Sequence, residues 1–129
     1  MRMILRILTI AIILIPVTIG SCKKQPKCGC DKDKIRSFAG IPVQIYYDEE
    51  NKSAKFYLVG DLYSTYHFCN PTEMMDKLTS FENGEEILVD CDIFWECSYI
   101  YQASNSYYAS MYKVYMVTVY DLREDLYGK

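Results

Sequence analysis

The chain has 129 residues, with 14 Lys or Arg against 17 Asp or Glu, so its net charge at pH 7 is −3. This length suits one small domain with a single hydrophobic core. The acidic balance argues against nucleic acid as a partner, because binding to phosphates needs clustered positive charge.

The first 21 residues have the layout of a secretory signal peptide. Arg2 and Arg6 come first, an apolar run covers Ile7–Ile15, and Pro16 and small residues follow. A charged start, an apolar middle and small residues before a cleavage site mark an export signal that is removed. We therefore expect residues 1–21 to be cleaved and the rest of the chain to lie outside the cytoplasm.

Cys22 adds a more specific signal. The segment Ile19-Gly20-Ser21-Cys22 resembles the lipobox of bacterial lipoproteins, in which the cysteine is lipidated and becomes the new first residue. This resemblance predicts a lipid (palmitate) on Cys22 that anchors the chain to a membrane. The alternative is an uncleaved membrane helix over Met3–Ile19, which is near the lower limit of length for crossing a bilayer.

A linker is expected over residues 22–34. This segment is rich in Lys, Asp and Gly and has almost no apolar side chains. It buries too little apolar surface to offset the entropy lost on ordering. We therefore expect a flexible linker over 22–34 and a single β-barrel domain over 35–125. The basic residues near the anchor either lie along anionic headgroups or stay solvated.

Alternation of apolar and polar residues predicts three strands at the start of the domain. On the first strand, one face carries Ile41, Val43, Ile45 and Tyr47. A polar loop over 48–53 leads to a second strand, whose apolar face carries Ala54, Phe56 and Leu58. Residues 63–69 are rich in aromatic and β-branched types and predict a third strand.

A short helix is expected after the third strand. Asn70 can cap it, Pro71 suits its first position, and Glu73 can reach back to the cap. Asn83-Gly84 then predicts a turn. A fourth strand follows with one face made of Ile87, Val89, Cys91, Ile93 and Trp95. On the last strand we assign to one face Tyr112, Val114, Met116, Tyr120 and Leu122.

The predicted order is three strands, one helix and two strands. One helix cannot cover both faces of an open parallel sheet, so antiparallel strands that close on themselves are favoured. We predict a mainly β fold, a small antiparallel five-stranded barrel (OB-like) with one short helix between strands 3 and 4. A small open sheet packed on the helix is the alternative.

Several features together resemble small uncharacterised lipoproteins of Gram-negative gut bacteria. They are the leader, the lysine-containing linker, Phe68-Cys69-Asn70-Pro71, Asn83-Gly84 and Ile87-Leu88-Val89. The resemblance implies a compact β-barrel, OB-like in some members, and it implies no activity. Some such lipoproteins carry an acidic surface-targeting signal after the lipidated cysteine. Lys23 and Lys24 stand there in this chain, so we expect the periplasmic side of the envelope.

Five cysteines follow Cys22, namely Cys28, Cys30, Cys69, Cys91 and Cys97. An exported chain lies in an oxidising compartment, where disulfides are favoured. Five is an odd number of cysteines, so at least one thiol stays unpaired or pairs with another chain. In a regular strand Cys91 and Cys97 lie about 20 Å apart, which is too far for a bond. We expect Cys69 to pair with Cys91, and Cys97 to pair with Cys28 or Cys30.

A metal site is the alternative use of these residues. Cys28 and Cys30, like His67 and Cys69, stand two apart, so each pair shares one side of an extended backbone. Thiolates with an imidazole suit Cu(I) or Zn(II), although the spacing is not that of a zinc finger. The alternative function is therefore a metal-handling periplasmic lipoprotein.

The sequence offers no motif for catalysis. His67 is its only histidine, and no Gly-x-Ser-x-Gly, His-Glu-x-x-His or phosphate-binding glycine loop is present. We therefore expect neither an enzymatic activity nor a cofactor.

Tyrosine gives the one functional signal. The chain has 13 Tyr, and one loop before the last strand contains Tyr99, Tyr101, Tyr107 and Tyr108. Recognition loops use Tyr with Ser and Asn, because Tyr offers contact area at low entropy cost. The loop between strands four and five is also a binding site in OB-folds. We expect a membrane-anchored binding module whose loop meets an envelope protein, a glycan or a peptide. The alternative is that these tyrosines only cover strands and barrel edges.

Overall fold

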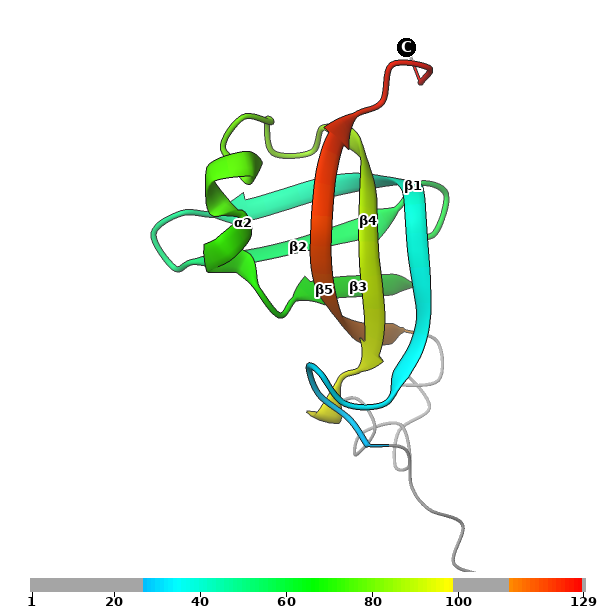
Figure 1. Cartoon of the computed structure of the whole chain (residues 1–129). Helices are drawn as coiled ribbons and strands as arrows, with labels where there is room; N and C mark the ends of the chain where they lie inside the picture. Colours follow the sequence, from blue (N-terminus) through cyan, green and yellow to red (C-terminus); the bar gives the residue numbers. More distant parts are fainter. Residues whose placement is uncertain (1–26, 99–111, 129) are drawn as a thin grey trace, which may run out of the picture.

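Five strands and one helix follow one another in the order expected from the sequence (Figure 1). The computed structural model of the protein describes residues 27–98 and 112–128. Its elements are β1 (Lys34–Asp48), β2 (Ser53–Leu58), β3 (Ser64–Phe68), α2 (Pro71–Leu78), β4 (Glu86–Trp95) and β5 (Lys113–Glu124). The prediction of a mainly β fold with one short helix between the third and fourth strands is confirmed for this part of the chain.

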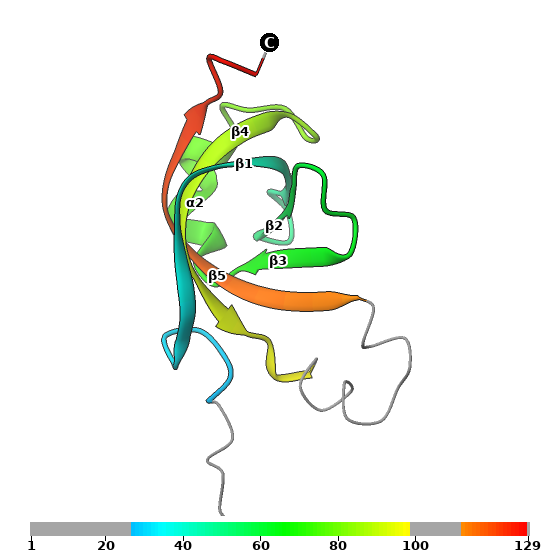
Figure 2. The ribbon, with the colours of Figure 1, turned by 90° about the vertical axis from the view of Figure 1, so that its right-hand side faces the viewer.

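The strands close into a barrel in the order β1-β2-β3-β5-β4. β1 pairs antiparallel with β2 along one edge and with β4 along the other. It reaches both partners because it is long and curves around the barrel (Figure 2). A bulge between Phe38 and Ile41 assists this curvature, and Gly40 adopts there a φ of 63° that favours glycine.

The prediction of a purely antiparallel barrel is wrong at one pair of strands. β3 and β5 run parallel, with Ser64 opposite Lys113 and Phe68 opposite Val117. The chain leaves β3 through α2, returns along β4 and then reverses into β5, so β5 has the direction of β3. The alternation of residues along a strand cannot report this, because it is the same in parallel and antiparallel pairs.

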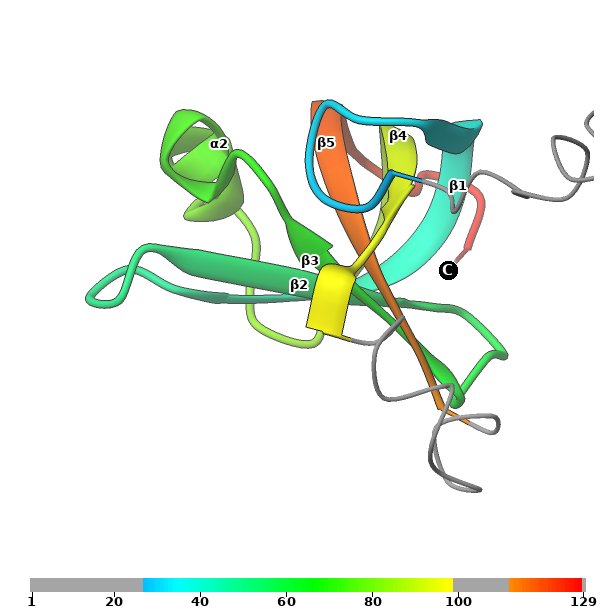
Figure 3. The same ribbon diagram turned by 90° about the horizontal axis from the view of Figure 1, so that it is seen from below.

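Alternate residues of the strands fill the barrel as the pattern predicted. Those on the first, second and fourth strands that are fully or almost fully buried are Val43, Ile45, Ala54, Phe56, Ile87, Val89, Cys91 and Ile93. The helix α2 lies beside the hairpin end of β1 and β2 (Figure 3). It adds Met74, Met75 and Leu78 to the same core.

The predicted inward face of the last strand is wrong over most of its length. Val117 and Val119 are buried, whereas Tyr112 and Tyr120 are exposed. The register against β4 jumps from Asp121 to Val119, so Tyr120 is an extra residue in a bulge. The bulge reverses the alternation, which explains why Leu122 is nevertheless buried as predicted.

Two disulfides fasten the start of the described chain to the barrel. Cys28 bonds to Cys97, and Cys30 bonds to Cys69, with Cα–Cα distances of 5.0 and 5.8 Å. The predicted partnership of Cys97 with Cys28 or Cys30 is confirmed. The predicted Cys69–Cys91 bond is wrong, because Cys91 is a free thiol that points into the core.

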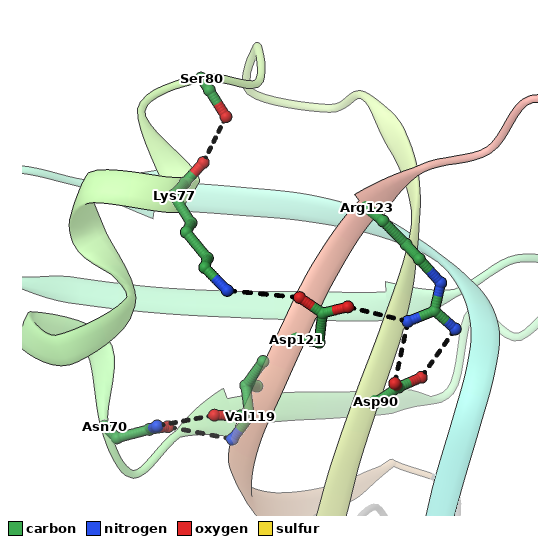
Figure 4. Close-up of polar contacts among 7 residues, drawn as sticks. All are labelled: Asn70, Lys77, Ser80, Asp90, Val119, Asp121 and Arg123. Carbon is green, nitrogen blue, oxygen red and sulfur yellow. Dashed lines mark hydrogen bonds and ion pairs between the residues drawn. The ribbon is translucent and has the colours of Figure 1, made fainter.

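Asn70 extends the junction between β3 and β5 (Figure 4). Its side-chain nitrogen donates to the Val119 carbonyl at 2.8 Å, and the Val119 N–H donates to its side-chain oxygen at 3.0 Å. Beyond the end of β3, the Asn70 side chain thus makes the two bonds to β5 that the backbone of a β3 residue would otherwise make. Asn70 does precede the helix, but its side chain makes no capping bond, because the amide is committed to β5.

We expect the thiols to report this connectivity directly. Burial, with Asp92 and Asp90 nearby, raises the pKa of Cys91 to about 12, so the native thiol should resist alkylation at pH 8. Alkylation in denaturant without reductant should modify Cys91, and peptide mapping should join Cys28 to Cys97 and Cys30 to Cys69. A Cys91→Ala variant serves as the control for the labelled site. A peptide that links Cys69 to Cys91 would contradict the structure.

Candidate functional site

The lipid-attachment residue and the predicted recognition tyrosines lie outside the described residues. These are Cys22, Tyr99, Tyr101, Tyr107 and Tyr108. The described chain stops at Ser98 and resumes at Tyr112, next to β5. Tyr112 and Tyr63 are more than half exposed, and their ring centroids lie 6.1 Å apart. An exposed aromatic pair therefore stands where the chain enters β5.

The four residues of the metal alternative do not form a ligand set in this structure. Cys28, Cys30 and Cys69 are all disulfide-bonded, so none of them is a thiolate. His67 lies on β3, opposite Lys55 of β2. Over residues 27–98 and 112–128, no group of three or more His, Cys, Asp or Glu side chains is arranged to hold a metal ion.

The structure instead places a set of aromatic and polar side chains on the outer face of β1, β2 and β3. We call this the outer-face site, made of Gln44, Tyr46, Lys55, Tyr57 and His67. The alternation explains it, because the neighbours of these residues along each strand point into the barrel. Lys55 stands in the middle of one row across the sheet, opposite Tyr46 on β1 and opposite His67 on β3.

Tyr46 and Tyr57 form the aromatic centre of the outer-face site. Their rings meet edge to face, with centroids 5.8 Å apart and an interplanar angle of 79°. The Lys55 amine lies 5.6 Å from the centre of the Tyr57 ring. On its other side Tyr46 packs across Gly84, where a Cβ would come within 3.5 Å of the Tyr46 hydroxyl. These contacts hold the Tyr46 ring in place on the surface.

Two pockets have Tyr46 among their lining residues. One, of about 540 Å³, is bordered by Tyr46, Asp48, Ser53, Lys55 and His67, together with Tyr47, Ala54 and Asn83. The other, of about 370 Å³, is bordered by Gln44, Tyr46, Tyr57, Leu58, Val59, Gly60 and Leu62. Tyr46 is the one residue that lines both pockets.

The net charge of the side chains that line the first pocket is small at neutral pH, because Lys55 and Asp48 have opposite charges. Burial, and secondly the nearby Lys55, lower the pKa of His67, while Glu96 acts in the opposite direction. His67 is therefore a neutral imidazole at pH 7, with one donor and one acceptor nitrogen. The Asp48 carboxylate accepts bonds from Asn51 and Glu50, which lower its pKa. These bonds shape the β1–β2 turn.

The outer face of β4 and β5 has a different character (Figure 4). Lys77 contacts Asp121 at 3.3 Å, and Arg123 contacts Asp121 at 3.1 Å and Asp90 at 2.8 Å. The Arg123 bonds lower the pKa of Asp90. Asp92 is likewise engaged by Ser37, Tyr120 and Lys34. Each of these carboxylates is bonded to neighbouring side chains of the same protein. We therefore interpret this face as a network of surface ion pairs and not as a ligand site.

Part of the outer-face site was accessible from the sequence. The alternation puts Gln44 and Tyr46 opposite the apolar face of the first strand, so their outward direction was predictable. Their partnership with Tyr57 and Lys55 required the strand register, which the sequence does not contain. The tyrosines over 99–108 are crowded in the sequence, whereas Tyr46 and Tyr57 lie 11 residues apart on separate strands.

Comparison of the chain with protein-family models, with curated proteins and with solved structures gave no match. Among the described residues, no helix is both long enough and apolar enough to cross a membrane. Of the surfaces described, the outer-face site combines pockets, aromatic rings and hydrogen-bonding groups.

We expect the single histidine to titrate below its ordinary pKa of about 6.5. Because protons then bind the unfolded state more readily, stability should fall as pH drops below 6.5 through the lowered folded pKa. NMR titration of the imidazole should give the midpoint. Lys55→Met should raise that midpoint, and Lys52→Met, in the exposed turn, should leave it unchanged. A midpoint at or above 6.5 in the unaltered protein would contradict this environment.

Proposed function

We propose that this protein is a binding module of the cell envelope, anchored to a membrane by a lipid on Cys22 and lying on the periplasmic side. The leader and the lipobox-like segment support the anchor. The two disulfides support an exported location, because such bonds persist in oxidising compartments. Cys28 is only six residues beyond Cys22, so the Cys28–Cys97 bond supports a short tether between the proposed anchor and the barrel.

The barrel topology supports an OB-like assignment. Its strand order is β1-β2-β3-β5-β4, and its helix lies between β3 and β4. OB-folds bind oligonucleotides and oligosaccharides over strands 2 and 3 and the loops between strands 1–2 and 4–5. The outer-face site covers the first of these regions. The Tyr-rich loop joins β4 to β5, so Tyr99, Tyr101, Tyr107 and Tyr108 remain part of the proposed binding surface.

The observation that carries the proposal is the pair of pockets that share Tyr46. A fixed aromatic ring that borders two hollows offers broad contact without a large loss of side-chain entropy. Around it, Lys55, His67 and Gln44 can exchange hydrogen bonds with a ligand. Such a surface acts by binding and needs no covalent step.

Crosslinking in living cells tests this function. The full chain would be expressed with a photocrosslinker at exposed Tyr127, near the C-terminus, or at Lys55 in the outer-face site. We expect envelope components to crosslink from position 55 and much less from position 127. Tyr46→Ala should reduce the products at position 55 several-fold, because the ring that borders both pockets is removed.

The control is a clickable palmitate label, which should appear on the full chain and on Tyr46→Ala but not on Cys22→Ser. Changing the four loop tyrosines to Ser reports whether the loop contributes. Absence of the label would remove the proposed anchor. Equal crosslinking from positions 55 and 127 would remove the proposed binding surface.

A further inference from the structure

We propose that the outer-face site takes an elongated, uncharged glycan, with successive sugar rings in the two pockets and Tyr46 as the side chain that both rings contact. This inference rests on the proposed function and adds to it the class of ligand. The shape, the charge and the hydrogen-bonding groups of the surface favour this ligand.

The shape favours a chain of several units. The first pocket includes Ser53 at the start of β2, and the second includes Leu58 at its end. Five steps along a strand cover about 17 Å. The pockets adjoin at Tyr46, so a ligand that fills both must be continuous across that ring. A single sugar can occupy only one of them.

The backbone pairing disfavours an extended peptide. A peptide that adds to a sheet needs a strand edge with free N–H and C=O groups. β2 is paired with β1 from Ser53 to Leu58, and with β3 at Lys55 and Phe56. β3 is in turn paired with β5. Where β2 is paired on both sides, at Lys55 and Phe56, a ligand is therefore held by side chains rather than by added backbone pairing.

The charge disfavours nucleic acid and other polyanions. Among the residues that line the two pockets, the only cationic side chain is Lys55, and Asp48 lies in the same pocket. The second pocket has no charged lining residue. A phosphate backbone would need several cations along this path.

The remaining groups match the chemistry of a sugar chain. The ring faces of Tyr46 and Tyr57 can cover the apolar C–H face of a pyranose, while Gln44, Ser53 and the neutral His67 can pair with its hydroxyls. Leu58, Val59 and Leu62 give the second pocket an apolar side. The methyl group of an acetamido substituent suits that side, so we expect N-acetylated sugars to bind more tightly than plain ones.

Calorimetry with two series of uncharged oligosaccharides tests the inference. The probes are cello-oligosaccharides and N-acetylchito-oligosaccharides of one to six units, titrated into the detergent-solubilised, disulfide-intact full chain. Affinity should rise with chain length until both pockets are filled and then level off. The N-acetylated series should bind more tightly at equal length.

Variants locate the site and control for folding. Tyr46→Ala should lower the affinity of the longer oligosaccharides about tenfold and abolish the dependence on length. Tyr46→Phe keeps the ring and should bind like the unaltered protein. Leu62→Ser should weaken the N-acetylated series only. Tyr127→Ala, at a side chain that is 96% exposed near the C-terminus, is the matched control and should change nothing.

Each contrary outcome has a distinct meaning. Binding without dependence on length would overturn the two-pocket geometry. Equal affinities of Tyr46→Ala and Tyr127→Ala would overturn the location. No binding of either series, with Tyr46-dependent crosslinking retained in cells, would overturn the glycan class and leave the proposed binding function standing. Loss of both results would remove that function as well.

Discussion

The barrel depends on the junction between β3 and β5. These two strands are the only parallel neighbours in the described barrel, and they are paired over five residues each. Beyond them Cys69 donates its N–H to the Val117 carbonyl, and the Asn70 amide then bonds both backbone groups of Val119. A buried backbone group without a partner costs about 1–3 kcal/mol. The Asn70 side chain avoids this cost by pairing with the N–H and C=O of Val119, as a further residue of β3 would.

The junction also determines the shape of the outer-face site. β3 has only two registered pairs with β2, at Lys55–His67 and Phe56–Tyr66, so its position relies on β5. Beneath the site, the rings of Phe56, Tyr66 and Tyr115 stack across β2, β3 and β5 with centroids 5.0 and 5.1 Å apart. This inner stack holds β2 and β3 together, and their outer faces carry Lys55 and His67. The inner ring stack and the proposed binding surface thus lie on opposite faces of β2 and β3.

Local pattern and long-range pairing differ in what the sequence reveals. Strict alternation identified the inward residues of the first and second strands and of the fourth strand as far as Ile93. Beyond Ile93 it failed, because Phe94 is also buried. Pro71 marked the helix, because such signals lie within a few residues. The last strand is apolar on both sides and contains a bulge at Tyr120, so its face could not be read from alternation. The partners of Cys69, Asn70 and Tyr46 lie 39, 49 and 11 residues away, and only the register brings them together.

The most direct test of this account is the stability of an Asn70→Ala variant in urea, measured against Thr72→Ala on the exposed first turn of α2. Removing the amide leaves two backbone groups of Val119 unpaired, so the free energy of unfolding should fall by about 2 kcal/mol. Hydrogen exchange at Val119 should rise with it, while Thr72→Ala leaves both quantities near their original values. Equal stability of the two variants, with Val119 still protected in Asn70→Ala, would contradict closure of the barrel through this side chain.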